Sequence, residues 1–152
     1  MRIGDICTRE VVTCSPGASV AELAVLMREH HVGDVIVIES SGDERIPVGI
    51  VTDRDVAVKV VARRVDPDMV TARDIMNEVV TVLESEVVYD AIWSMRRKGV
   101  RRLPVVDGNN ALFGLLSADD LVQFLAEELT ELARVSPRQR QDEQDRLETT
   151  RG

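Results

Sequence analysis

A hydroxyl residue followed three positions later by an aspartate occurs twice in this chain, each time after a glycine and two apolar residues. The first copy occupies residues 49–55 and contains Thr52, and the second occupies residues 114–120 and contains Ser117. This spacing is the capping pattern of a helix N-terminus, where the two side chains satisfy free backbone N–H groups. The same geometry can bind a ligand. A helix N-terminus attracts phosphate, and a carboxylate one turn into the helix can accept hydrogen bonds from both hydroxyls of a ribose. The motif alone is therefore compatible with capping and with nucleotide binding.

The two motifs belong to an internal repeat with an offset of roughly 65 to 69 residues, and such a repeat defines the architecture of a chain. Residues 11–13, Val-Val-Thr, recur as residues 79–81, and the pair Met27-Arg28 recurs as Met95-Arg96. A two-fold repeat implies two units related by a pseudo-two-fold axis. Any site at their junction should therefore have a twin, and differences between the twins are informative.

Each repeat has the pattern of a short strand, a helix, two strands and a second helix. In repeat 1 we predict strands at 11–13, 35–38 and 48–51, a polar loop at 39–47, and helices starting at Ser19 and Thr52. In repeat 2 we predict strands at 79–82, 103–106 and 112–116, and helices at 88–97 and from Ser117 to about 133. Neither repeat alone has enough apolar residues for a stable core. The sequence therefore predicts one α+β unit in which the two repeats pack against each other.

The predicted boundaries are repeat 1 at 3–62, a linker at 63–71, repeat 2 at 72–133 and a polar tail at 134–152. The tail is too polar to bury a core of its own. We expect it to be disordered, or to form a helix that orders only against a partner chain.

Composition excludes several classes of function. A net charge of -8 argues against non-specific nucleic-acid binding, and the low aromatic content of 3% leaves few residues for stacking on bases. No stretch is apolar enough to span a membrane and the N-terminus lacks the features of a secretory signal, so we expect a cytoplasmic protein. Cys7 and Cys14 have no metal-binding spacing and are expected to be half-buried free thiols. No metal site, catalytic triad or P-loop is apparent, which argues against an enzyme.

The two motifs, each at the end of a β-α-β-β-α unit, together with residues 100–107 (Val-Arg-Arg-Leu-Pro-Val-Val-Asp), resemble a tandem pair of CBS domains, also called a Bateman module. The resemblance covers roughly residues 3 to 130 and is strongest to small stand-alone bacterial members. It implies a regulatory module that binds AMP, ADP, ATP or S-adenosylmethionine in clefts between the repeats. It also implies a disc-like homodimer and, because no output domain is attached, an unknown protein partner.

The resemblance assigns the base to the first strand and the start of the second strand of one repeat, and the ribose and phosphate to the motif of the other repeat. Two candidate clefts follow. Cleft A consists of Thr52, Arg54, Asp55, Val80, Val100, Arg101 and Arg102. Cleft B consists of Val12, Val32, Gly33, Asp34, Ser117, Asp119 and Asp120.

The two clefts have opposite charge. Cleft A contains three arginines, which suit forked contacts to phosphate, whereas cleft B contains the extra carboxylates of Asp34 and Asp119. We therefore hypothesise that cleft A binds a nucleotide phosphate, and that cleft B is empty or binds an uncharged or cationic adenosyl compound. The alternative is that these charges are solvated surface groups. A ligand-free, stress-associated interaction module is the competing function.

Overall fold

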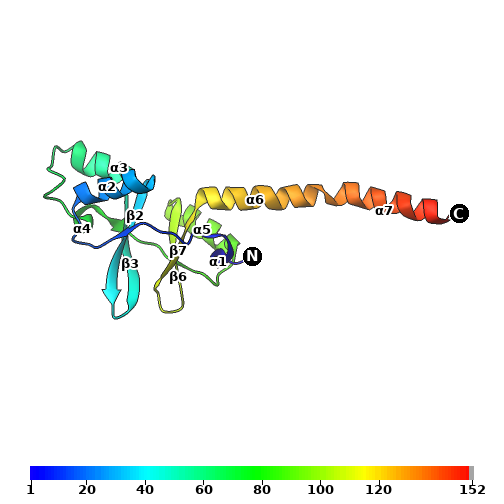
Figure 1. Ribbon diagram of the computed structural model, residues 1–152, viewed down its shortest axis with the longest axis horizontal. Helices are drawn as coiled ribbons and strands as arrows, with labels where there is room; N and C mark the ends of the chain where they lie inside the picture. Colours follow the sequence, from blue (N-terminus) through cyan, green and yellow to red (C-terminus); the bar gives the residue numbers. More distant parts are fainter. Residues whose placement is uncertain (151–152) are drawn as a thin grey trace.

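The computed structural model describes residues 1–150 and contains two sheets, one for each repeat (Figure 1). The first sheet has the order β1-β2-β3-β4, formed by β1 (Thr13–Cys14), β2 (Asp34–Ser41), β3 (Glu44–Thr52) and β4 (Asn77–Glu78). The second has the order β5-β6-β7, formed by β5 (Val82–Leu83), β6 (Arg102–Val106) and β7 (Leu112–Ser117). In both sheets a short strand pairs in parallel with the first strand of a hairpin. The predicted α+β fold of two similar units is confirmed.

The helices are α1 (Ile3–Ile6), α2 (Val20–His30), α3 (Asp53–Asp55), the π-helix η1 (Val56–Val61), α4 (Ala72–Ile75), α5 (Val88–Lys98), α6 (Ala118–Ala133) and α7 (Val135–Thr150). Four of them, α2, α3, α4 and α6, begin after a serine or threonine N-cap. At the start of α2, Ser19 Oγ accepts a hydrogen bond from Glu22 N at 3.1 Å, and Ser19 N donates to the Glu22 carboxylate at 2.7 Å. Helix α5 ends at Gly99 in the left-handed conformation, which glycine adopts without strain.

Each of the short helices α1 and α4 packs into the core of the other repeat. Ile3 of α1 is fully buried in the core of repeat 2, whereas Ala72 and Ile75 of α4 belong to the core of repeat 1. Backbone hydrogen bonds hold α1 in place, because Ile3 N donates to Glu86 O at 2.9 Å. Each core therefore contains residues from both repeats. This mutual burial explains why the two repeats form one unit.

The prediction of a polar loop over residues 39–47 was wrong. Strand β2 continues to Ser41 and β3 begins at Glu44, with Gly42 in the left-handed conformation at the turn. The outer part of this hairpin is held by backbone pairing and needs no apolar side chains, so its polar composition concealed the strands. The predicted first strand is also displaced, since β1 begins at Thr13.

The C-terminal segment forms helix α7, which continues α6 and projects from the body of the protein (Figure 1). Every residue of α7 from Val135 to Thr150 is exposed. The segment predicted as a polar tail is therefore helical over Val135–Thr150, and its ordering against a partner chain stays a prediction. No helix in residues 1–150 is both long and apolar enough to cross a membrane.

Candidate functional site: two clefts between the repeats

Asp55 of the first motif is almost fully enclosed, with 9% of its surface exposed. Its Oδ2 accepts hydrogen bonds from Thr52 N at 2.8 Å, from Thr52 Oγ1 at 2.9 Å and from Asn77 Nδ2 at 2.8 Å. Its Oδ1 lies 3.1 Å from Lys59 Nζ. Burial alone would raise the pKa of Asp55, but the hydrogen bonds from Thr52, Asn77 and Lys59 outweigh burial and lower the pKa below its usual value.

Lys59 reaches Asp55 from the π-helix η1, a rare conformation that often occurs at functional sites. Its ammonium group also donates to Ile75 O at 2.8 Å and to Asn77 Oδ1 at 2.9 Å. Both oxygens of Asp55 are therefore already used by the protein, and a ribose would have to displace Lys59 or Asn77 to reach them.

Asp120 of the second motif is held differently. Its Oδ2 accepts hydrogen bonds from Ser117 N at 2.8 Å and from Ser117 Oγ at 2.7 Å, which repeats the capping geometry of the first motif. Within residues 1–150, its other oxygen, Oδ1, accepts no hydrogen bond. Asp120 therefore caps α6 and still has a free carboxylate oxygen.

This carboxylate lines a cavity of about 290 Å³ between the repeats. Six predicted cleft B residues border the cavity: Val12, Val32, Gly33, Asp34, Ser117 and Asp120. The cavity is also bordered by Thr8, Glu10, Val11, His31, Arg102 and Leu115. The sequence interpretation missed Thr8 and Glu10, although their position just before Val12 was a usable signal. Thr8 exchanges backbone hydrogen bonds of 2.9 Å with Leu115, so the segment crosses directly from one repeat to the other.

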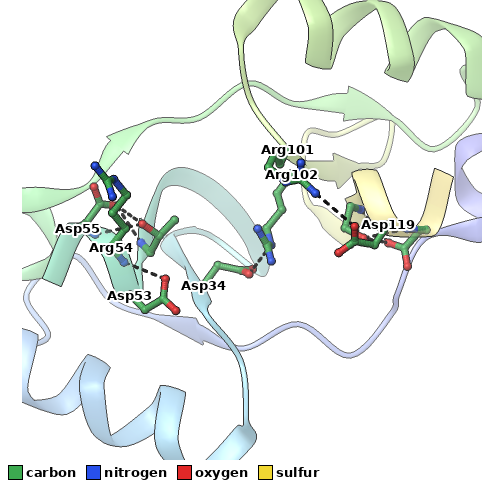
Figure 2. Close-up of polar contacts among 10 residues, drawn as sticks. Asp34, Asp53, Arg54, Asp55, Arg101, Arg102 and Asp119 are labelled. Carbon is green, nitrogen blue, oxygen red and sulfur yellow. Dashed lines mark hydrogen bonds and ion pairs between the residues drawn. The ribbon is translucent and has the colours of Figure 1, made fainter. Parts of the chain in front are cut away.

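An ion pair joins the two repeats at the wall of this cavity. Asp34, at the start of β2, lies 2.5 Å from Nε of Arg102, at the start of β6 (Figure 2). The Asp34 side chain is 7% exposed and the Arg102 side chain 36%. Burial raises the pKa of Asp34, and the neighbouring guanidinium opposes this rise.

The three arginines assigned to cleft A have separate surroundings (Figure 2). Arg102 borders the cavity of cleft B. Arg101 makes an exposed contact of 3.3 Å with Asp119, the kind of surface pair that contributes little to stability. Arg54 is exposed on α3 beside Asp55. The remaining members of the cleft A set, Val80 and Val100, pack against the core of repeat 2.

The two cysteines, Cys7 and Cys14, are half-buried and free, in agreement with the sequence interpretation. Burial raises the pKa of Cys14 to about 11, so this thiol is protonated at neutral pH. No group of three or more potential ligands for a metal ion occurs in residues 1–150.

The contacts of Asp55 predict a pH-dependent contribution to stability. Because the folded-state pKa is lowered, the stabilisation is complete above the unfolded-state pKa of about 3.9 and is lost as the pH falls through the folded value. We expect Asp55→Asn to lower the free energy of unfolding by roughly 1–3 kcal/mol at pH 6, and by progressively less below about pH 4. Urea denaturation across pH measures this difference. Asp53→Asn is the control, because within residues 1–150 the Asp53 side chain accepts a hydrogen bond from the neighbouring Arg54 N–H alone. A difference that is independent of pH would contradict the prediction.

Comparison with known proteins identifies the family. The CBS domain model matches residues 3–62 and 70–127. Protein MK0525 of Methanopyrus kandleri is 42% identical over 122 residues, which cover 80% of this chain and 61% of that protein. The chain thus spans less than two thirds of this relative.

Two solved structures share the fold and carry adenosyl ligands. The CBS domain protein PAE2072 from Pyrobaculum aerophilum, complexed with AMP, is 32% identical with a TM-score of 0.72, over 80% of this chain and 90% of that chain. The CBS domain pair of protein MJ0100, in complex with 5′-methylthioadenosine and S-adenosylmethionine, is 25% identical with a TM-score of 0.71, over 82% of this chain and 99% of that chain. The fold, the repeated motif and the family match over both repeats agree, and the chain belongs to the CBS domain family as a tandem pair.

Proposed function

We propose that this protein is a non-catalytic regulatory module that binds an adenosyl compound in cleft B. The observation that carries the proposal is the position of Asp120, whose free carboxylate oxygen borders an inter-repeat cavity of about 290 Å³. The opposite wall, which contains Val12 and Val32, supplies apolar side chains against which an adenine can pack. The ribose hydroxyls would donate to Asp120, and the Ser117 hydroxyl would complete the polar end of the site.

The ligands of the two related structures support the adenosyl class. AMP is bound to PAE2072, and 5′-methylthioadenosine and S-adenosylmethionine are bound to the MJ0100 pair. The proposal includes AMP, ADP, ATP and S-adenosylmethionine as candidate ligands of this chain, and the binding experiment below distinguishes among them.

The contacts favour cleft B over cleft A as the main site. The hypothesis from the sequence placed a nucleotide phosphate in cleft A, beside Thr52 and Asp55. Asp55 is already occupied by Lys59 and Asn77, and breaking these contacts would reduce the net affinity for a ligand. Phosphate binding in cleft A stays a prediction, with a lower expected affinity.

Isothermal titration calorimetry with adenosine, 5′-methylthioadenosine, AMP, ATP and S-adenosylmethionine tests the proposal. We expect at least one compound to bind with one high-affinity site per chain and to raise the melting temperature, because a ligand specific to the folded state stabilises it. No binding by any compound would contradict the proposal. That result would favour the alternative of a ligand-free, stress-associated interaction module.

We further propose that the signal passes through a homodimer and a protein partner. Large apolar side chains are exposed on α5 at Tyr89 and Trp93, four positions apart on one helix face, and on α6 at Val122 and Leu129. Contiguous exposed apolar surface is typical of interaction sites. Light scattering of the purified chain should give the mass of a dimer, and a concentration-independent monomer would contradict this part of the proposal.

A further inference from the structure

The ion pair between Asp34 and Arg102 lies in the wall of cleft B. Three acidic side chains line the cavity, those of Glu10, Asp34 and Asp120. Among the lining residues, Arg102 is the one arginine or lysine, and its Nε is held by Asp34. The group best suited to bind a phosphate in this cavity is therefore already neutralised by the protein.

The pair arises from the pseudo-symmetry of the two repeats. Asp34 pairs in register with Thr52 of the first motif, and Arg102 pairs in register with Ser117 of the second. Asp34 and Arg102 are thus equivalent positions that carry opposite charges, and their side chains point toward each other (Figure 2). Neither side chain caps a helix or belongs to the hydrophobic clusters of the two cores, and both border the cavity.

We propose that Asp34 sets the charge class of the ligand, so that cleft B prefers adenosyl compounds without a 5′-phosphate over nucleotides. This inference rests on the proposed binding of an adenosyl compound in cleft B. It adds that Asp34 excludes phosphate by occupying Arg102.

The physical reason is the cost of leaving a buried carboxylate without a partner. A phosphate that takes over the Nε of Arg102 must separate it from Asp34, whose side chain is 7% exposed and makes no other hydrogen bond or ion pair within residues 1–150. A phosphate that binds the Nη groups instead meets the Asp34 carboxylate beside them. Removing one partner of a buried ion pair is strongly unfavourable. A 5′-substituent without negative charge leaves the pair intact and avoids this cost. The remaining carboxylates, Glu10 and Asp120, add further repulsion to an anion.

Comparison of two ligands that share adenosine and differ at the 5′ position tests the inference. In the wild-type protein we expect 5′-methylthioadenosine to bind at least about tenfold more tightly than AMP, a difference of about 1.4 kcal/mol. In Asp34→Asn, the uncharged side chain releases Arg102 for phosphate. We expect the affinity ratio to move at least about tenfold toward AMP, since charge-assisted contacts to phosphate are strong.

Two further variants isolate the role of the pair. In the double variant Asp34→Asn/Arg102→Gln the gain for AMP should disappear, because the gain depends on the released guanidinium. Glu39→Gln is the matched control. Glu39 lies on β2, like Asp34, and its carboxylate forms an exposed ion pair with Arg73, but it does not border the cavity, so the ratio should stay unchanged.

The outcomes separate this inference from the proposed function. Equal or tighter binding of AMP by the wild type overturns the inference and leaves the proposed function standing, and this measurement needs no variant to fold. An unchanged ratio in Asp34→Asn, with folding verified by circular dichroism, also overturns it. Absence of binding by both compounds in the wild type, with no response to the wider panel, contradicts the proposed function and the inference with it.

Discussion

Replacing Asp120 by alanine is expected to lower the affinity for an adenosyl ligand by about a hundredfold, because the free carboxylate oxygen in cleft B is lost. Hydrogen bonds to a charged group contribute about 1.5–3 kcal/mol each, and a ribose can donate two. Titration calorimetry of Asp120→Ala with the tightest ligand of the panel measures the loss. An affinity within about threefold of wild type would contradict the assignment of the ribose to Asp120.

The control variant must lose an equivalent helix cap at a residue that does not border cleft B. Asp74 provides it, because its Oδ2 accepts hydrogen bonds of 2.9 Å from both Thr71 N and Thr71 Oγ1, the arrangement found between Asp120 and Ser117. We expect Asp74→Ala to keep full ligand affinity. Asp55→Ala tests cleft A in the same experiment. If AMP binding is lost in Asp120→Ala and kept in Asp55→Ala, the hypothesis of a phosphate site in cleft A is contradicted.

The second large effect is expected at the glycines that begin the two motifs. A methyl group on Gly114 would lie 2.7 Å from the backbone oxygen of Thr8 and 2.7 Å from Cys7 Sγ. The Thr8 oxygen accepts the hydrogen bond from Leu115 N that joins the inter-repeat segment to β7. The Thr8 backbone cannot move away from the added methyl group without breaking its hydrogen bond to Leu115. We therefore expect Gly114→Ala to lower the free energy of unfolding by about 1–3 kcal/mol, as overpacking of a core does.

The twin glycine is the matched control for this prediction. A methyl group on Gly49 would lie nearest Sδ and Cγ of Met76, which a change of rotamer can move away, and 3.0 Å from Met76 Cβ, which must shift by a few tenths of an ångström. Gly49→Ala should therefore destabilise the protein less than Gly114→Ala, as measured by urea unfolding of both variants. Equal losses of stability in the two variants would contradict this prediction, because the Thr8 backbone would then move as easily as the Met76 side chain. Because Thr8 also borders cleft B, Gly114→Ala should weaken ligand binding, whereas Gly49→Ala should not.

Much of the fold could be predicted because the responsible interactions are local. The capping box at Ser19, the apolar runs of β2 and β6 and the hydroxyl-x-x-carboxylate caps all act within a few residues. The outer hairpin between β2 and β3 was missed because backbone pairing there does not require an apolar pattern. The placement of α1 and α4 was also missed, because the sequence of a four-residue helix does not indicate which core will bury it.

The candidate clefts were predicted less completely than the motifs that form them. Six of the seven cleft B residues border one cavity, and their role in ligand binding stays a prediction. The contacts that distinguish the twins involve residues far apart in the chain. Asn77 lies 22 positions from Asp55, and only the pairing of β4 with β3 brings it within reach.

The sequence by itself determined the repeat, the two capped motifs and the inequality of charge between them, because these depend on residue type and short spacing. The tertiary structure decided which charges meet. Packing about the pseudo-two-fold axis places the starts of β2 and β6 together, so that Arg102 contacts Asp34, while Lys59 and Asn77 occupy Asp55. Charge complementarity between distant residues follows from the geometry of packing, and a linear pattern does not contain that geometry.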